Sequence, residues 1–492
     1  MFDAAEQGHR ISNAAFGRAE PGLRTALLEA QYAVLDQSRF PVIVIIGGVD
    51  GGGKGETLNL LTTWMDPRHI HAHAFGRASH EELDHPPMWR FWRTLPRKGR
   101  MAIYFDSWYT GPMLDHALAG TGNKRFQRSI EKTFSFEQML ANEGALIVKF
   151  WFHLSKKAQE NRFKTLERDP LTRWRVTDTD WRHHKHYKSL RASSERVLQA
   201  TSTPFAPWFV IEGADANYRH LMASRLLLQA MQKRLSDSAA PRAPRVTTPR
   251  VRSTDGESPF AALSLQRSLA RGRYRPELAK QQGMLNLLSR SSRFRKRGVV
   301  AVFEGPDAAG KGGAIRRITA ALDARFYQVV PISVPDTEEL ARPYLWRFWR
   351  LIPRLGRFTI FDRSWYGRVL VERVEGHASA SDWSRAYGEI NDFEQELTDG
   401  GLIVVKFWLA ISKQEQLARF RARQKTPYKR FKITRDDWRN REKWDDYQAA
   451  AEDMVARTST AIAPWTLIAA NDKHFARIKV LKNLCERIEA AL

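Results

Sequence analysis

The 492-residue chain repeats itself at a fixed offset. Lys54 lies in GGVDGGGKGE and Lys311 in EGPDAAGKGG, which places the two lysines 257 residues apart (311 − 54). The same offset relates RFWRTLPRKGR, from Arg90, to RFWRLIPRLGR, from Arg347. It also relates IVKFW to VVKFW, PLTRWRVT to PYKRFKIT, and Pro207-Trp208 to Pro464-Trp465. An offset kept over several hundred residues indicates a duplicated domain, so we expect two copies of one fold.

The boundary between the copies is visible in the composition. Residues 236–259, SDSAAPRAPRVTTPRVRSTDGESP, are rich in Pro, Ser, Thr and Arg and contain few large apolar side chains. Such a segment cannot bury a core, which favours an extended linker over an ordered connector docked on the surface. The predicted domains are therefore residues 1–235 and 260–492.

The order of elements within each copy predicts an α/β fold. A helical segment (Leu23–Gln37, and Leu278–Ser292 in the second copy) precedes a short apolar run, PVIVII or GVVAVFE. Continuous Val/Ile-rich runs are typical of strands buried on both faces of a parallel sheet. In the second copy a helix over Gly312–Leu322, a strand ending at Asp362 and a strand over Leu402–Trp408 follow. Alternating strands and helices predict a parallel sheet flanked by helices in each copy.

A phosphate-binding loop is predicted between the first strand and the next helix of the second copy. GPDAAGK, from Gly305 to Lys311, fits the pattern G-x-x-x-x-G-K in the strand–loop–helix context that this pattern requires. Backbone N–H groups and the helix N-terminus would bind an anion, and the lysine would reach the outer phosphates. The expected phosphate-binding residues of this segment are Gly305, Ala308, Ala309, Gly310, Gly312 and Gly313.

Two acidic residues are candidates for binding Mg²⁺. The residue after Lys311 is Gly312, so the hydroxyl that usually contacts the metal is missing. Asp307, inside the loop, is interpreted as a magnesium ligand or as a group that orients the attacking phosphate; a turn-stabilising role is the alternative. Asp362 ends an apolar strand, the position at which P-loop enzymes hold a magnesium-binding aspartate.

Basic residues near these acids are candidates for neutralising phosphoryl charge. Arg363 and Arg368 flank Asp362 in FDRSWYGR, and both could stabilise the transferred group. Arg347 is a further candidate, although it could instead cap a helix. Residues 413–443 carry 12 Lys/Arg and 4 Asp/Glu, a net charge of +8 (12 − 4). We expect this segment to close as a basic lid, rather than to form a solvated face without a ligand, through Lys425, Lys429, Arg430 and Lys432.

The first copy keeps Asp50 and Lys54 of the loop but departs elsewhere. Its strand ends in IYFDSWYTG. Without a gap Phe105 takes the place of Asp362; with a gap Asp106 keeps that place and the arginine is lost. Either way one charge is missing, so we assign chemistry to the second copy.

Composition narrows the class of partner. The net charge of +25 predicts a polyanion: nucleic acid, an acidic membrane surface or a phosphate-rich substrate. The single cysteine, Cys485, excludes an intrachain disulfide and a cysteine-based zinc cluster. The apolar runs are too short to span a bilayer, and the first twenty residues lack the apolar core of a signal peptide, so a cytoplasmic location is expected.

The second-copy motifs GPDAAGKGG, RPYLWRFWRLIPRLGR, FDRSWYGR and KTPYKRFKIT, in this order, resemble the polyphosphate kinase 2 family. The resemblance implies a P-loop kinase fold with a helical lid, similar to thymidylate kinase. It implies transfer of a phosphoryl group from inorganic polyphosphate to AMP, giving ADP, with Mg²⁺. The two-copy arrangement resembles the branch of the family that phosphorylates AMP through its C-terminal copy.

By motif position, Asp307 and Lys311 fall on the family's loop. Asp362, Arg363 and Arg368 fall on its second acidic motif, and Lys429, Arg430 and Lys432 on its lid. ADP as the acceptor, an ATP-dependent nucleotide kinase and a polyanion binder without activity are the alternatives. Neither nucleic acid nor a membrane is the expected partner, and homo-oligomerisation is left open.

Overall fold

The computed structural model describes residues 1–237 and 258–492, so nearly all of the predicted linker, 236–259, lies outside the described residues. The chain divides into two compact units that follow its two halves, apart from two short segments. Residues 79–90, with α3 (His80–Leu83), group with the second unit, and residues 336–343, with α13 (Thr337–Leu340), group with the first.

The first unit contains a five-stranded parallel sheet with the strand order β2-β3-β1-β4-β5. Its strands are β1 (Val42–Gly48), β2 (Ile70–Ala74), β3 (Met101–Phe105), β4 (Leu146–His153) and β5 (Trp208–Glu212). The helices of this half of the chain are η1 (Phe2–Ala5), α1 (Asn13–Gln37), α2 (Lys54–Trp64), η2 (Pro67–His69), α4 (Trp89–Trp92), α5 (Thr110–Leu118), α6 (Asn123–Asn142), α7 (Lys156–Arg168), η3 (Arg173–Arg175), α8 (Asp178–Lys185), α9 (Tyr187–Thr201) and α10 (Ala216–Ser236).

The second unit repeats this topology with the order β10-β9-β6-β8-β7, again all parallel. Its strands are β6 (Gly298–Glu304), β7 (Tyr327–Pro331), β8 (Phe358–Asp362), β9 (Leu402–Ala410) and β10 (Trp465–Ala469). Its helices are α11 (Arg271–Arg290), η5 (Phe294–Lys296), α12 (Lys311–Thr319), η6 (Ala324–Phe326), α14 (Trp346–Trp349), η7 (Trp365–Val369), α15 (Val371–Val374), α16 (Ala380–Asp399), α17 (Lys413–Lys425), η8 (Pro427–Lys432), α18 (Arg435–Glu442), α19 (Trp444–Thr458) and α20 (Lys473–Ala491). The predicted pair of parallel α/β domains is confirmed.

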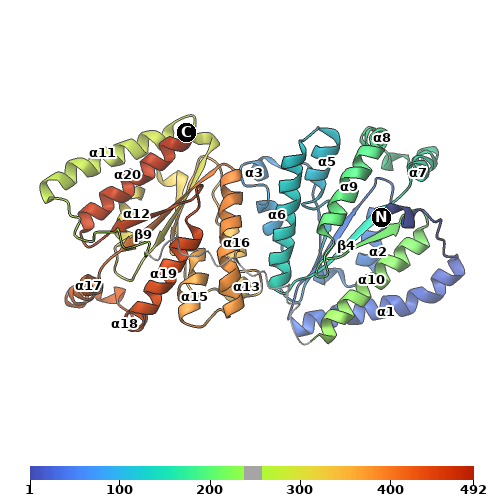
Figure 1. The fold of residues 1–492 in the computed structure, drawn as a ribbon. Coiled ribbons are helices and arrows are strands. Elements are labelled where there is room, and N and C mark those ends of the chain that lie inside the picture. The colour runs from blue at the N-terminus through green and yellow to red at the C-terminus, as the bar shows by residue number, and fades with distance from the viewer. Residues whose placement is uncertain (238–257) are drawn as a thin grey trace. The chain divides into compact units, whose positions relative to one another are not determined.

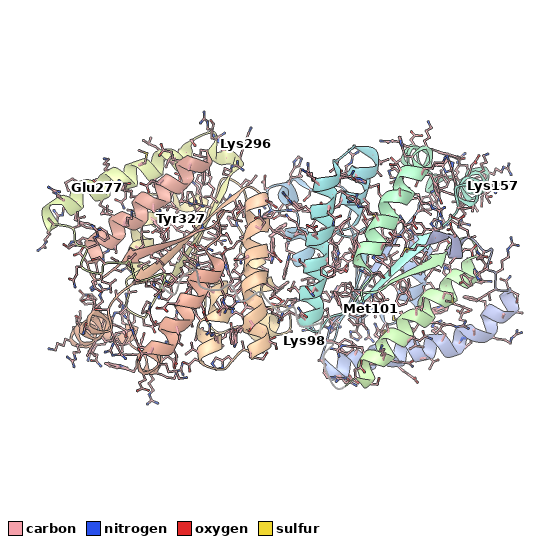
Figure 2. The ribbon with its side chains drawn as sticks, in the orientation of Figure 1. Lys98, Met101, Lys157, Glu277, Lys296 and Tyr327 are labelled. Atoms are coloured by element: carbon pink, nitrogen blue, oxygen red, sulfur yellow. The ribbon has the colours of Figure 1, made fainter. Side chains whose placement is uncertain are left out.

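The core of the second unit shows why the apolar runs form central strands. All seven residues of β6 are buried, as expected for a strand covered on both faces. Every second residue of β6 points to the same face of the sheet, and Val299, Ala301 and Phe303 thereby enter a core completed by α11, α12 and α20. In Figure 1, α11 and α20 run side by side along this face of the sheet, and α16 covers the other face. Figure 2 shows exposed lysines such as Lys157 of α7 and Lys296 of η5 on the outside of their own units.

The elements differ from the expectation mainly at their ends. The first helix of each copy begins earlier than predicted, at Asn13 and at Arg271. For α1 the reason is a cap, because Ser12 accepts a hydrogen bond from the N–H of Ala15 at 3.2 Å. The helix after the phosphate loop ends at Thr319 rather than Leu322. The lid segment is two helices, α17 and α18, joined by η8, which begins at Pro427.

A buried ionic network is built identically in the two units. In the second, Lys406 of β9 donates to Glu394 at 2.7 Å, to Tyr366 at 2.8 Å and to the carbonyl of Thr458 at 2.6 Å. The hydroxyl of Tyr366 and the indole of Trp365 donate to the other oxygen of Glu394. In the first unit Lys149, Glu137, Tyr109, Trp108 and Thr201 form the same contacts. Because the network persists in both copies, it belongs to the fold rather than to the chemistry of one site.

Across residues 1–237 and 258–492, no helix is both long enough and apolar enough to traverse a lipid bilayer.

Candidate active site

The loop between β6 and α12 has the strained backbone of an anion-binding turn. Gly305 has φ +137°, and a Cβ there would lie 2.5 Å from the carbonyl oxygen of Leu409, so only glycine fits. Ala308 adopts φ +63°, a left-handed conformation that costs an L-residue roughly 1–2 kcal/mol. Strain of this kind persists where a function requires it. The loop delivers its last residue, Lys311, to the first turn of α12.

Asp307 is held between the lid and the end of β8. Its Oδ1 accepts a hydrogen bond from Arg363 at 2.7 Å, and its Oδ2 accepts one from Asn440 of α18 at 2.9 Å. Its main-chain oxygen accepts a hydrogen bond from Gln416 of α17 at 3.1 Å. Burial alone would raise the pKa of Asp307, but Lys311, Arg363 and Asn440 outweigh burial and hold this pKa below its ordinary value. The carboxylate is therefore ionised and fixed in orientation.

Asp362 faces the same loop from the end of β8. Its Oδ2 lies 3.9 Å from the position that a Cβ on Gly312 would take. Within the part of the chain that the structure describes, the carboxylate of Asp362 has no hydrogen-bond or ion-pair partner. The next residue, Arg363, adopts φ +65°, and this turn directs its guanidinium to Asp307.

Lys311 completes the cluster. Its ammonium donates to the carbonyl of Gly305 at 2.6 Å and to that of Pro306 at 3.3 Å. Burial, followed by the charge of Arg363, lowers the pKa of Lys311, although Asp307, Asp362 and Glu304 act in the opposite direction. Predicted residues Asp307, Lys311, Asp362 and Arg363 thus converge on one site, together with the loop glycines and alanines.

The other predicted residues make contacts outside this cluster or are exposed. Arg368 forms an ion pair with Glu372 at 3.0 Å, and its guanidinium lies 4.4 Å from the ring centre of Tyr344. Arg347 donates to the carbonyl of Ser333 at 3.1 Å. The predicted lid cations are exposed at the end of α17 and along η8: Lys425, Lys429, Arg430 and Lys432.

A pocket of about 710 Å³, counted to its open mouth, opens beside Asp307 and Arg363. Its remaining wall is largely apolar and includes Leu370, Trp444 and Tyr447. The pairing of the phosphate loop with an aromatic wall could not be read from the sequence, because Trp444 and Tyr447 stand in α19 without a motif around them.

Two further polar residues of the site were missed by sequence reasoning. Glu304 is buried, accepts a hydrogen bond from Ser364 at 2.8 Å and has its pKa raised by burial. Asn440 connects the lid to Asp307. A comparison of the two copies at the fixed offset could have pointed to both residues, because Gly47 and His183 stand in the places of Glu304 and Asn440. The two copies therefore differ at both positions.

The residues present fit a magnesium ion shared with phosphates better than a closed protein cage. No cluster of three or more His, Cys, Asp or Glu side chains suited to a metal occurs within residues 1–237 or 258–492. Mg²⁺ is commonly held by one or two carboxylates, phosphate oxygens and water. Among the residues that the structure describes, none is a partner of the Asp362 carboxylate, whereas both oxygens of Asp307 already accept hydrogen bonds.

The first unit resolves the alignment left open by its sequence. Phe105 ends β3 and Asp362 ends β8, and each pairs with the same position of its central strand. The following residue is left-handed in both units, with φ +56° at Asp106 and φ +65° at Arg363. The ungapped alignment is therefore correct. An apolar ring, 5.6 Å from the ammonium of Lys54, replaces the carboxylate at this point of the first unit.

A phosphate loop at the end of a central parallel strand, a carboxylate at the end of the neighbouring strand and a lid carrying Asn440 define a P-loop kinase-like protein. The model of the family described as Polyphosphate kinase 2 (PPK2) matches residues 11–239 and again residues 268–492. The chain belongs to this family.

Relatives extend the similarity over the whole chain. It is 53% identical over 491 residues to the polyphosphate:AMP phosphotransferase of Pseudomonas aeruginosa, covering 100% of this chain and 99% of that protein. It is 39% identical to the polyphosphate:AMP phosphotransferase of Acinetobacter johnsonii, covering 96% of each. A crystal structure from Pseudomonas aeruginosa described as a polyphosphate kinase 2 matches with a TM-score of 0.91 and 51% identity, covering 100% of this chain and 99% of that one.

Proposed function

We propose that the chain transfers the terminal phosphoryl group of inorganic polyphosphate to AMP, giving ADP and a polyphosphate shortened by one unit. The observation that carries this proposal is the convergence of Lys311, Asp307, Arg363 and Asp362 beside a pocket with an aromatic wall. Charged groups for a phosphoryl donor and an apolar, aromatic surface for a base lie together at this pocket, beside the phosphate loop. The relatives named above carry the same activity in their names.

The donor is proposed to lie on the loop and the acceptor in the pocket. The terminal phosphoryl group would rest against the N–H groups at the start of α12 and the ammonium of Lys311. The base of AMP would pack against Trp444 and Tyr447 of the pocket wall. An oxygen of the AMP phosphate then forms a bond to the terminal phosphorus of the donor as the bridging P–O bond breaks.

This chemistry needs charge neutralisation more than proton transfer. The attacking phosphate oxygen is already anionic, so a general base is not required. Arg363 and Lys311 would stabilise the transferred group, and Asp307, fixed by Arg363 and Asn440, would keep that arginine in place. Mg²⁺, which we propose as the cofactor, would be held by Asp362 and would supply further charge on the phosphates.

A product assay tests the proposal. The purified protein is incubated with Mg²⁺ and each pairing of donor (polyphosphate or ATP) with acceptor (AMP, ADP or GDP), and nucleotides are separated by chromatography. Polyphosphate with AMP is expected to give ADP at the highest kcat/KM. Transfer from ATP alone would instead indicate an ordinary nucleotide kinase, and tight polyphosphate binding without any product would indicate a polyanion-binding protein.

A second prediction concerns pH and Asn440. The low pKa of Asp307 keeps its carboxylate ionised until the pH falls below the ordinary range for aspartate. Asn440→Ala removes one stabilising hydrogen bond, so this pKa rises and the acid limb of the pH profile of kcat/KM is expected to move to higher pH. Asn440→His is the matched control, because His183 contacts Asp50 at 2.8 Å in the first unit. An acid limb that stays in place in Asn440→Ala would exclude Asp307 as the titrating group.

A further inference from the structure

The duplication provides an internal comparison at the first turn of the phosphate-loop helix. In the first unit this turn contains Glu56, and an offset of 257 residues places Gly313 at the same position of the second. The Glu56 carboxylate is surrounded by guanidinium groups: Arg162 lies at 2.8 Å, Arg175 at 3.3 Å, and Arg219 of α10 donates to its other oxygen. The first unit therefore shows an anion bound at this turn, and that anion is its own side chain.

At the corresponding turn of the second unit, basic side chains are present but the carboxylate of Glu56 has no counterpart. Gly313 has no side chain, and the guanidinium of Arg477 lies 3.4 Å from where its Cβ would be. Arg477 stands in α20, the helix that corresponds to α10, one position beyond the counterpart of Arg219. Within the described residues neither Arg477 nor Lys473, one turn earlier in α20, has a hydrogen-bond or ion-pair partner.

The neighbouring charges of the second unit are also positive. Burial, followed by the charge of Arg419, lowers the pKa of Lys473; Arg477 and Lys429 act in the same direction, and Glu415 opposes them. Arg419 itself is committed to the fold, because it donates to the carbonyls of Ala308 and Ala309 and pairs with its neighbour on α17. Arg477 and Lys473 thus remain available for a bound anion.

The first unit has no basic residue that corresponds to Lys473 and no arginine that corresponds to Arg477. The residues in the places of Lys473 and Arg477 are Ala216 and His220. The exchange is partial: the unit with a carboxylate at the turn keeps an arginine on its last helix, Arg219, which binds that carboxylate, and has no lysine in the place of Lys473. The unit with a glycine has both a lysine and an arginine on its last helix, and no carboxylate at the turn. Such an exchange is expected if the same place accepts an external polyanion in one unit and an internal acid in the other.

We propose that Gly313, Arg477 and Lys473 form a subsite for the donor chain, one that holds an inner phosphate while the terminal phosphoryl group lies on the loop. This inference rests on the proposed function. Gly313 provides space for a phosphate at the first turn of α12, where the helix dipole favours an anion. Arg477 binds its oxygens as a planar donor, and Lys473 contributes a point charge further along the chain.

Steady-state kinetics of three variants test the subsite. Arg477→Ala is expected to raise the KM for long-chain polyphosphate roughly tenfold, the loss of one hydrogen bond to a charged group, with kcat and the KM for AMP unchanged. Gly313→Glu reproduces the first unit and is expected to weaken long-chain binding more strongly than Arg477→Ala. Lys479→Ala is the control: it removes one positive charge from the exposed face of α20, two residues or about 200° around the helix from Arg477.

The outcomes separate this inference from the function itself. A KM for polyphosphate in Arg477→Ala equal to that of Lys479→Ala, or an equal rise in the KM for AMP, would overturn the subsite while leaving the transferase proposal intact. If the unaltered protein shows no transfer, the proposed function fails. The subsite is then judged by direct binding of long-chain polyphosphate, which Arg477→Ala should weaken roughly tenfold and Lys479→Ala should not. Thermal unfolding confirms that each variant is folded before either measurement.

Discussion

Lys311→Ala is expected to abolish phosphoryl transfer, whereas Lys54→Ala is expected to leave most of it. The ammonium of Lys311 interacts electrostatically with Asp307, Asp362 and Glu304. Its hydrogen bond to the carbonyl of Gly305 holds it at the loop. Removing a preorganised positive group that neutralises transition-state charge costs on the order of 10²–10³ in kcat, and loss of the loop lysine should also weaken donor binding. Together these losses place kcat/KM below roughly a thousandth of its original value.

Lys54 is the matched control because it occupies the same position in the first unit, where the phosphate loop is kept but the carboxylate that corresponds to Asp362 is missing. Its ammonium donates to the carbonyl of Gly48 at 3.0 Å and lies 3.5 Å from Asp50, as expected for a phosphate loop. However, Phe105 stands where the second unit has Asp362, and Glu56 occupies the first turn of the helix. An acid at that turn repels phosphate and already binds the nearby arginines.

The measurement is initial-rate kinetics with polyphosphate and AMP for both variants and for Asp362→Asn. We expect Asp362→Asn to behave as Lys311→Ala does, because it removes the carboxylate proposed to hold Mg²⁺. Full activity in Lys311→Ala with loss of activity in Lys54→Ala would reverse the assignment of chemistry to the second copy.

The fold could be predicted from the sequence because its signals are local and repeated. The apolar run GVVAVFE is followed directly by the loop motif, and the constant offset of 257 residues between matching motifs indicates the duplication. A buried parallel strand needs continuous apolar residues, and these are as visible in the sequence as in β6. Helix ends were less predictable, since they depend on single capping contacts such as that of Ser12.

The candidate site was only partly predictable, because its motif residues are local and its other contacts are not. Asp307, Lys311, Asp362 and Arg363 come from two strand ends that are neighbours in the sheet, so their convergence follows from the topology. Asn440 lies 133 residues from Asp307, and nothing in its own segment marks it. Arg368 was expected at the site from its motif; in the structure it pairs with Glu372, four residues on, and lies against the ring of Tyr344, a contact that sequence spacing does not reveal.

Lys406→Met is expected to destabilise the second unit by about 3–5 kcal/mol, because it leaves the fully buried Glu394 without its cation. Tyr366 and Trp365 would still donate to this carboxylate, but neither neutralises it. Chemical denaturation of the full chain is the measurement. Lys149→Met, which breaks the same pair in the first unit, is the matched variant and should cost that unit a similar amount.

The double variant Lys406→Met/Glu394→Gln distinguishes loss of a charge partner from loss of packing. If the cost comes from an unpaired buried charge, removing that charge should recover more than half of the stability lost in Lys406→Met. A double variant no more stable than the single one would show that the lysine stem matters through packing, or that its bonds to Tyr366 and Thr458 dominate.

The pH dependence of Lys406→Met follows from the same pair, with a definite sign. Burial raises the pKa of Glu394, and in the native protein Lys406 opposes that rise. Without Lys406 the folded-state pKa rises further above that of the unfolded chain, so the variant is most stable below the ordinary pKa of glutamate and loses stability as the pH rises through the folded value. Because Trp365 and Tyr366 follow Asp362 and Arg363 within four residues, the same loss should loosen the turn that carries the proposed metal ligand. Activity of the variant is therefore expected to fall with rising pH at temperatures where the native protein is still fully folded.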